Sequence, residues 1–243
     1  MQTPDIGFPV RRRWLGFCAA LIATVVAVFL APRETARAAD PVDVQLVLAI
    51  DTSGSVSPRR FTLQQQGYVD AFRDPRVLAA IQSGMARSIA VTMFQWTGPR
   101  LHVPVVPWMR ISDQASAEAL SSAINAVPRK LFGGGTSVSG AIDYAMSLFP
   151  QSPYDGERRI IDVSGDGSNN SGRPAESARD AAVKDGVTIN GLPILTIEPD
   201  LDDYYQNSVI GGEGSFVITV KTDADFAAAI LKKLIAEIAM KGP

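Results

Sequence analysis

Two residue types that bind metals or carry redox chemistry are almost missing from this chain of 243 residues. Its only cysteine is Cys18, and its only histidine is His102. Cys18 lies within an apolar segment near the N-terminus, so disulfides, thiolate metal sites and cysteine catalysis are excluded for the remainder of the chain. A single histidine leaves no pair for a zinc site.

An excess of basic residues is also lacking, since the formal net charge is −2 and the sequence pI is about 5.5. Residues 1–39 contain five arginines against Asp5 and Glu34, a net charge of +3, so residues 40–243 carry −5. An acidic chain of this kind is a poor partner for the phosphate backbone of a nucleic acid. We therefore expect no nucleic-acid binding.

The N-terminus has the order of a secretory signal peptide. Three arginines at positions 11–13 precede the apolar segment Trp14–Leu30, and Ala36-Arg37-Ala38-Ala39 follows it. This basic, apolar and small-residue order predicts cleavage after Ala38 or Ala39. A retained membrane anchor is the alternative, although spanning a membrane takes roughly 20 apolar residues.

These features predict a signal peptide over residues 1–39 and one domain over residues 40–243. The protein is then exported, periplasmic or secreted, with no membrane span after cleavage. The arginine pattern does not separate the general export route from the twin-arginine route. About 200 residues suffice for one sizeable hydrophobic core. The sequence leaves the oligomeric state open.

Short apolar runs alternate with amphipathic, helix-like stretches through residues 40–243. This alternation is typical of an α/β domain with a doubly wound, mostly parallel sheet and helices on both faces, a Rossmann-like architecture. We expect six strands, at Val44–Ala49, Ser88–Trp96, Leu101–Trp108, Arg159–Ser164, Val187–Thr196 and Ser215–Val220.

One of these strands is expected to be antiparallel and to lie at an edge of the sheet. The connection at positions 97–100 is too short for a helix, so Leu101–Trp108 must pair back on the strand before it. Pro104 and Pro107 fit an edge position, because proline cannot donate a ladder hydrogen bond. His102 lies on this strand, and we expect it to be a surface residue.

The stretch Asp51-Thr52-Ser53-Gly54-Ser55 directly follows the first expected strand. Asp51, Ser53 and Ser55 alternate, so an extended backbone directs their three oxygens the same way. One carboxylate and two hydroxyls form half of a hard, oxygen-only cation site that suits Mg²⁺ or Mn²⁺. The competing interpretation is an ordinary strand-to-helix turn with serine caps.

Two further oxygen-bearing stretches are expected to meet this one. Ligands of open α/β sheets bind at the carboxyl ends of the strands, where the strand order reverses. Right-handed crossovers place the first strand beside the strand that ends before Gly165-Asp166-Gly167. The glycine loop that carries Thr136 leads into the helix that precedes that strand. The sequence therefore predicts a cation site at this edge.

The three-part pattern of Asp51-x-Ser53-x-Ser55, a Gly-Gly-Thr136 loop and Asp166-Gly167 resembles the metal-ion-dependent adhesion site (MIDAS) of von Willebrand factor A-type, integrin I-like domains. The resemblance covers nearly all of residues 40–243, and it is greatest to exported bacterial members whose role is not established. It implies that Ser53, Ser55 and Thr136 supply hydroxyls to the metal, while Asp51 and Asp166 supply carboxylates, commonly through water. Ser164-Gly165 departs from the family pattern, in which many members have an apolar residue and threonine.

The resemblance implies a protein-binding module rather than an enzyme. An acidic residue of a partner protein completes the coordination of Mg²⁺, or of Mn²⁺ or Ca²⁺, and no residue is catalytic. One alternative is a Mg²⁺-dependent, phosphatase-like hydrolase with Asp51 as its nucleophile, but Ser53 and Asn170 stand where such enzymes need acids. The other is an A-type domain whose motif is purely structural.

Two further features bear on these expectations. The loop from Glu198 to Tyr205 follows a strand and should emerge on the same face as the metal site. Its acids serve as solvated charge and a helix cap, or else Tyr204 and Tyr205 form part of a partner surface. Asp162 lies within an apolar strand, where a structural hydrogen bond is expected rather than a ligand role.

Overall fold

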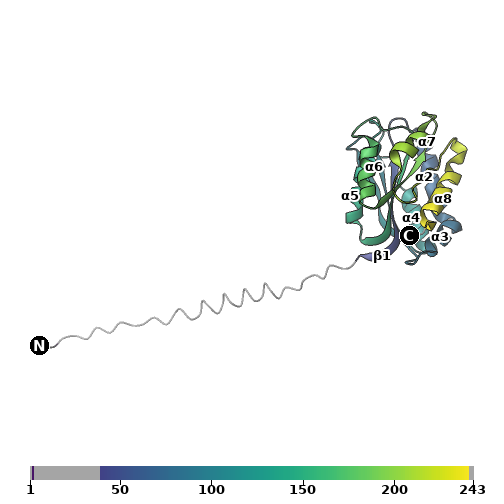
Figure 1. Cartoon of the computed structure of the whole chain (residues 1–243). Helices are drawn as coiled ribbons and strands as arrows, with labels where there is room; N and C mark the ends of the chain where they lie inside the picture. The colour runs from purple at the N-terminus through teal and green to yellow at the C-terminus, as the bar shows by residue number, and fades with distance from the viewer. Residues whose placement is uncertain (1, 3–38, 241–243) are drawn as a thin grey trace. The chain divides into compact units, whose positions relative to one another are not determined.

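The computed structural model describes Gln2 and residues 39–240 (Figure 1). The signal peptide expected over residues 1–39, including Cys18, thus lies almost wholly outside the described residues and remains a prediction. Within the described part, no helix has the length and the apolar character needed to cross a membrane.

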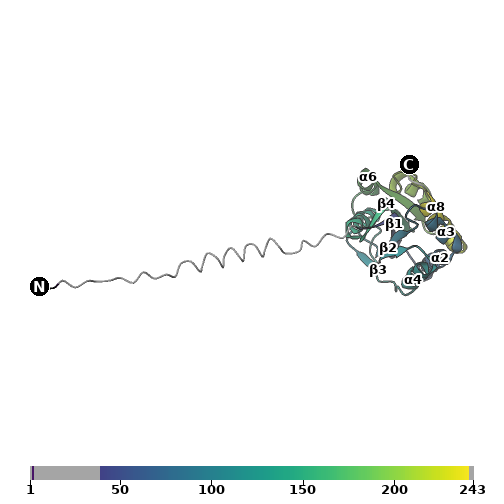
Figure 2. The ribbon, with the colours of Figure 1, turned by 90° about the horizontal axis from the view of Figure 1, so that it is seen from below.

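The core element is a mixed sheet with the strand order β3-β2-β1-β4-β5. Strands β1, β2, β4 and β5 are parallel, and β3 pairs antiparallel with β2, as the short connection and the two prolines predict. Figure 2 shows β3 beyond β2, at the edge of the sheet. The strands are β1 (Asp40–Asp51), β2 (Ile89–Trp96), β3 (His102–Ile111), β4 (Tyr154–Gly165) and β5 (Val187–Pro193).

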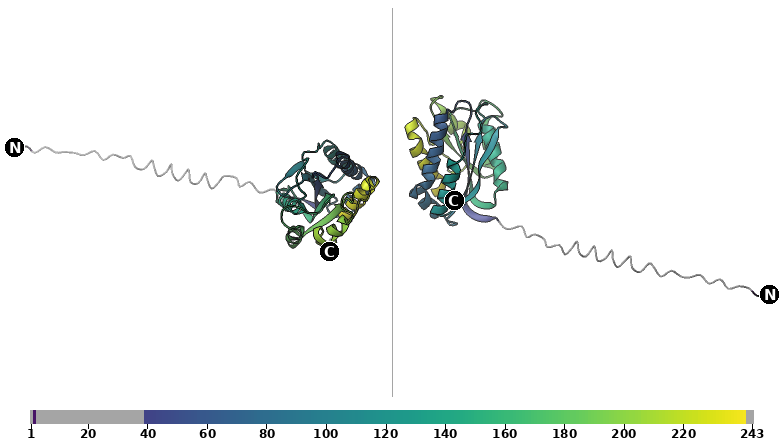
Figure 3. Two further views of the ribbon diagram at one scale, coloured as in Figure 1. Left: turned by 90° about the horizontal axis from the view of Figure 1, so that it is seen from above. Right: turned by 180° about the vertical axis from the view of Figure 1, so that it is seen from behind.

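Helices cover both faces of this sheet (Figures 1 and 3). One face packs against α2 (Pro58–Arg73), α3 (Pro75–Gln82), α4 (Gln114–Asn125) and α8 (Phe226–Ala239), and the other against α5 (Val138–Leu148) and α6 (Ala175–Lys184). Short helical segments complete the chain at η1 (Phe149–Gln151), α7 (Leu201–Tyr204), η2 (Tyr205–Val209) and η3 (Asp223–Asp225).

The period-2 geometry of β1 divides the core into two layers. Leu46 and Leu48 point into the layer beneath α2 and α8, whereas Val47 and Ala49 point into the layer beneath α5 and α6. All four side chains are buried, which is why this strand reads as a continuous apolar run. The predicted doubly wound α/β fold is confirmed.

The sheet has five strands rather than the six expected, because Ser215–Val220 does not form a regular strand. This segment lies along β5 and makes only isolated bridges, at Val217 and Val220. The N–H of Phe216 donates to the side-chain Oδ1 of Asn190 at 3.1 Å, so a side chain takes the place of a backbone ladder acceptor. The pairing is therefore interrupted where a sixth strand would begin.

The strand order reverses between β1 and β4, as predicted. The chain leaves β1 through α2 and α3 toward β2, and it returns to β4 on the other side of β1. Ile50 pairs with Ser164, so the two strands end level with each other. Asp51 and Asp166 are thereby brought to the same edge of the sheet.

Candidate metal centre

Asp51 is the last residue of β1, and its carboxylate is buried. The Oδ1 atom accepts a hydrogen bond from the N–H of Ser53 at 2.7 Å, whereas Oδ2 has no hydrogen-bond partner within the described residues. Burial raises the pKa of Asp51 to about 7, and the charge of Asp166 adds to the rise against the opposing N–H of Ser53. An unpaired buried carboxylate oxygen is costly unless something satisfies it.

Two serine hydroxyls connect this strand end to Asp166. The Oγ atoms of Ser53 and Ser55 lie 3.0 Å apart, and the Oγ of Ser55 donates to the Oδ1 of Asp166 at 2.5 Å. The alternation of oxygen-bearing residues after Asp51 therefore leads directly to the carboxylate that follows β4.

Asp166 resembles Asp51 in its environment. Its side chain is buried, and its Oδ2 atom also lacks a hydrogen-bond partner within the described residues. Burial raises the pKa of Asp166, as does the nearby charge of Glu198, while the hydrogen bond from Ser55 and the charge of Arg60 lower it. The Nη1 of Arg60 lies 4.0 Å from that Oδ2 atom.

Thr136 reaches the same place from the glycine loop before α5. Its N–H donates to the Oδ1 of Asn170 at 2.9 Å, and its C=O accepts from the N–H of Asn170 at 2.9 Å. Gly134, with φ of +103°, supplies the left-handed turn before it. A Cβ built on Gly167 would lie 3.6 Å from the Oγ1 of Thr136, so this hydroxyl lies beside the loop that carries Asp166.

The departure at Ser164-Gly165 has a steric reason. A Cβ on Gly165 would lie 2.8 Å from the hydroxyl of Tyr205 and 3.0 Å from the Oδ2 of Asp51. Only glycine lets β4 pass this close to both groups. Tyr205 is thus fully buried beneath the centre, and the hypothesis that it forms part of a partner surface is wrong.

The residues present fit a divalent cation. Among the described residues, Asp51 and Asp166 each have a buried oxygen without a hydrogen bond, the hydroxyls of Ser53 and Ser55 lie between them, and that of Thr136 lies beside Gly167. Carboxylates and hydroxyls are ligands for Mg²⁺, Mn²⁺ or Ca²⁺. No cluster of three or more His, Cys, Asp or Glu side chains suited to a metal exists in the described residues, so a cation here depends on carboxylates and hydroxyls together.

Arg129 supports the candidate centre, and the sequence did not predict this. Its guanidinium donates to the carbonyls of Thr52 and Ser53, both at 2.9 Å, and to the carbonyl of Val56 at 2.7 Å. The planar fork of arginine suits several acceptors at once. This side chain therefore holds the backbone of the loop after β1, and no local sequence pattern links position 129 to position 53.

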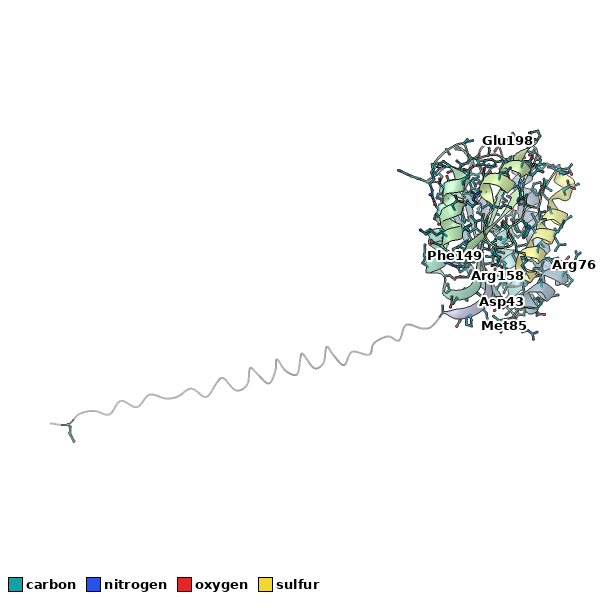
Figure 4. All side chains as sticks on the ribbon, in the orientation of Figure 1. Asp43, Arg76, Met85, Phe149, Arg158 and Glu198 are labelled. Carbon is teal, nitrogen blue, oxygen red and sulfur yellow. The ribbon has the colours of Figure 1, made fainter. Side chains whose placement is uncertain are left out.

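Glu198 is a second residue whose contacts beside the candidate centre the sequence did not predict. Its carboxylate accepts from the N–H of Ser168 at 3.0 and 3.1 Å, next to the loop that carries Asp166. Figure 4 shows Glu198 at the end of the fold opposite Asp43 and Met85, which is the end where β1 and β4 terminate. The expectation of freely solvated loop charge is wrong for this residue, which is half-buried.

Asp162, His102 and Tyr204 each make a contact that supports the fold. Asp162 accepts a hydrogen bond from the hydroxyl of Tyr68 at 3.0 Å, which confirms its expected structural role. His102 is only partly exposed because its ring stacks on Tyr144, with the ring centroids 4.8 Å apart. The hydroxyl of Tyr204 accepts from the N–H of Asn169 at 3.3 Å, so it supports the loop after β4.

Several solved structures share this fold. Proximal thread matrix protein 1 from the mussel byssus is 15% identical with a TM-score of 0.58, and the match covers 82% of this chain and 49% of that one. The von Willebrand factor domain of the type V pili tip protein Mfa5 from Porphyromonas gingivalis is 12% identical with a TM-score of 0.55, covering 83% and 98%. The von Willebrand factor type A structure from Catenulispora acidiphila is 15% identical with a TM-score of 0.52, covering 82% and 43%.

At such identities the likeness concerns the fold, and the chain spans about half the length of the mussel protein. No curated protein matches the sequence. A family model described as "Protein of unknown function (DUF1194)" matches residues 41–242, nearly all of the part that forms the sheet and its helices. The chain therefore belongs to the DUF1194 family, and its fold is that of a von Willebrand factor A-type domain.

Proposed function

We propose that this protein is a binding module that grips an acidic residue of a partner protein through a divalent cation. Asp51, Ser53, Ser55, Thr136 and Asp166 would hold the cation. The observation that carries the proposal is that Asp51 and Asp166 each keep a buried Oδ2 atom without a hydrogen bond among the described residues, while Ser53 and Ser55 link their Oδ1 atoms.

The donor set explains why such a centre binds rather than catalyses. Three of its five side chains are neutral hydroxyls, which leave a bound cation electrophilic toward an outside carboxylate. The side chain at position 53, where a phosphatase-like hydrolase needs an acid, is the serine that contacts Ser55. Asn170 is engaged by the N–H of Thr136. Mg²⁺-dependent hydrolysis of an aryl phosphate, lost in Asp51→Asn, would favour the enzyme instead.

The proposed metal is Mg²⁺, with Mn²⁺ and Ca²⁺ as the alternatives. A mussel structure similar to this chain has a zinc-occupied MIDAS motif, so a divalent cation binds at the corresponding motif of that protein. In this chain all five side chains offer oxygen, and oxygen-only sets suit the hard cations better than zinc.

The surroundings of the centre indicate what flanks the partner's acid. Three of the large exposed apolar side chains of the described residues belong to the loops around it: Phe132 is 71% exposed, Ile197 52% and Leu101 47%. Phe132 directly precedes the glycine loop, Ile197 directly precedes Glu198, and a Cβ on Gly134 would lie 3.5 Å from Leu101. A partner segment with apolar residues beside its Asp or Glu fits this surface.

Export is part of the proposal, since residues 1–39 have the order of a signal peptide. The partner is then a protein of the periplasm or of the cell exterior. A fractionation of cells that express the chain, with N-terminal sequencing of the product, tests both cleavage after Ala38 or Ala39 and the compartment.

Thermal unfolding tests the metal centre. The purified protein is unfolded in chelator and then with Mg²⁺, Mn²⁺ or Ca²⁺, beside the variant Asp51→Ala. A cation at a hundred times its dissociation constant stabilises by about 2.7 kcal/mol, which is about 5–10 °C for a domain of this size. A shift in wild type that is absent in Asp51→Ala supports the proposal. The absence of a shift at millimolar metal would favour a purely structural motif.

Partner capture tests the binding step. Exported proteins retained by the immobilised chain in Mg²⁺ should be released by chelator and should not be retained by Asp51→Ala. Replacing the critical acid of the partner by its amide should abolish retention. Partner binding that changes neither with chelator nor in Asp51→Ala would contradict the proposal.

A further inference from the structure

The carboxylate of Glu198 lies at the candidate metal centre, although it comes from the loop after β5. A Cβ built on Gly167 would lie 3.4 Å from the Oε1 of Glu198 and 3.6 Å from the Oγ1 of Thr136, so both oxygens border the same glycine. The charge of Glu198 also acts on Asp166, the other neighbour of that glycine. A third carboxylate therefore stands beside Asp166 and the hydroxyl of Thr136.

Within the described residues, no arginine or lysine forms an ion pair with Glu198. Arg60 approaches one of these carboxylates, with its Nη1 4.0 Å from Asp166, and its Nε lies 4.0 Å from Asp223 as well. When the three carboxylates and Arg60 are ionised, their charges sum to −2. This deficit equals the charge of one divalent cation, and half-burial of Glu198 limits how much solvent can screen it.

We infer that Glu198 is a further residue of the metal centre, one that raises its affinity for a divalent cation. The three acids do not form a metal site by themselves, so Glu198 acts through a water molecule or through its charge. Its two contacts with the N–H of Ser168 hold the carboxylate in place. The added negative charge of Glu198 then helps the centre to hold its cation before a partner arrives.

The inference rests on the proposed cation site, and a charge-only substitution tests it. In Glu198→Gln the amide oxygen still accepts from the N–H of Ser168, so the loop keeps its anchor while one negative charge is lost. Asp200→Asn is the matched control, because it removes the same charge from the same loop. Asp200 is exposed, and its side chain makes no capping hydrogen bond.

Calorimetric titration with Mn²⁺ measures the affinity of each protein. We expect the dissociation constant of Glu198→Gln to rise about tenfold over wild type, since the number of charged ligands sets the affinity of such sites. Asp200→Asn should stay within about twofold. Unfolding in chelator should show Glu198→Gln folded as stably as wild type.

Different failures have different meanings. If wild type binds Mn²⁺ through Asp51 and Glu198→Gln binds it equally well, Glu198 only anchors the loop and this inference is wrong. An equal loss in Asp200→Asn would also overturn it, because the effect would then be one of overall charge. If wild type binds no Mn²⁺ at all, the proposed function fails together with the inference.

Discussion

The hydroxyl of Ser55 donates to the Oδ1 of Asp166 at 2.5 Å, although the two residues are 111 positions apart in the chain. This bond connects the loop after β1 to the loop after β4, the two strands between which the strand order reverses. It places a neutral hydroxyl against a buried carboxylate whose other oxygen has no hydrogen bond among the described residues. The local geometry thus leaves one oxygen of Asp166 free for a cation.

Asp51→Asn should stabilise the protein in the absence of metal. The substitution removes one of two buried charges that repel each other, and the amide oxygen still accepts from the N–H of Ser53. In chelator at pH 8 we expect a gain of about 1–2 kcal/mol in the free energy of unfolding. Denaturant unfolding measures it, with the exposed Asp155→Asn as the control. If Asp51→Asn were less stable than wild type in chelator, the buried charge of Asp51 would not be what destabilises the metal-free protein.

Arg129→Lys should weaken the proposed metal centre without changing any of its proposed ligands. The guanidinium donates from three nitrogens to four carbonyls, the fourth being that of Leu131 at 2.8 Å, whereas a lysine has three donors on one nitrogen. The loop after β1 therefore loses part of its clamp. We expect about 1–3 kcal/mol lower stability and a weaker affinity for Mn²⁺ by calorimetry.

Lys130→Ala is the matched control for Arg129, because the hydrogen bond of Lys130 to Gln95 comes from its backbone N–H. This control removes a neighbouring positive charge and leaves the clamp in place. Equal metal affinity in Arg129→Lys and wild type would show that the loop keeps its shape without the guanidinium.

Gly165→Ala should destabilise the fold through one identifiable contact. The new Cβ would meet the hydroxyl of Tyr205 at 2.8 Å, closer than its 3.0 Å approach to Asp51. We expect a loss of about 1–3 kcal/mol. Tyr205→Phe removes the nearer atom, and that hydroxyl has no hydrogen-bond partner among the described residues. The double variant should therefore recover part of the loss, and strict additivity in the double-mutant cycle would refute this explanation.

A buried cluster of charged side chains between α8 and the sheet predicts that the free energy of unfolding depends on pH. Lys233 lies 2.8 Å from Asp162 and also contacts Glu237, and the Nδ2 of Asn190 donates to Glu237 at 3.0 Å. Burial raises the pKa of Glu237 to about 7, against the opposing charge of Lys233. Glu237 thus binds a proton more tightly in the folded state than in the unfolded chain, whose ordinary value is 4.5.

The sign of the effect follows from proton linkage. Between pH 4.5 and about 7 the folded state holds a proton on Glu237 that the unfolded state has released, so stability falls as the pH rises through this window. The fall should amount to about 1–3 kcal/mol. Denaturant unfolding of wild type and Glu237→Gln from pH 4 to pH 8 isolates it as the difference between the two curves. A difference that does not change with pH would contradict the prediction.

Much of the fold was predictable from local patterns. The apolar run of β1 acts within a few residues, so its physical effect is visible in the sequence. The antiparallel edge strand followed from a short connection and the prolines at positions 104 and 107. The candidate site residues were predicted because the carboxyl ends of neighbouring parallel strands must meet.

Contacts between distant positions were decided by the tertiary structure alone. Tyr205 turns inward because Gly165 and Gly191 both leave room for its ring, whereas an isolated Tyr-Tyr pair in a loop indicates exposure. Ser215–Val220 has the composition of a strand, yet the Asn190 side chain competes for its backbone N–H.

Arg129 and Glu198 show the same limit at the metal centre. Arg129 is 76 positions from Ser53, and Glu198 is 30 positions from Ser168. Each lies on a loop whose path depends on how whole helices pack against the sheet. The sequence by itself determined which oxygens gather at the carboxyl edge of the sheet. Which charges and hydrogen bonds surround them depended on long-range packing, because such contacts have no periodicity that a local pattern can carry.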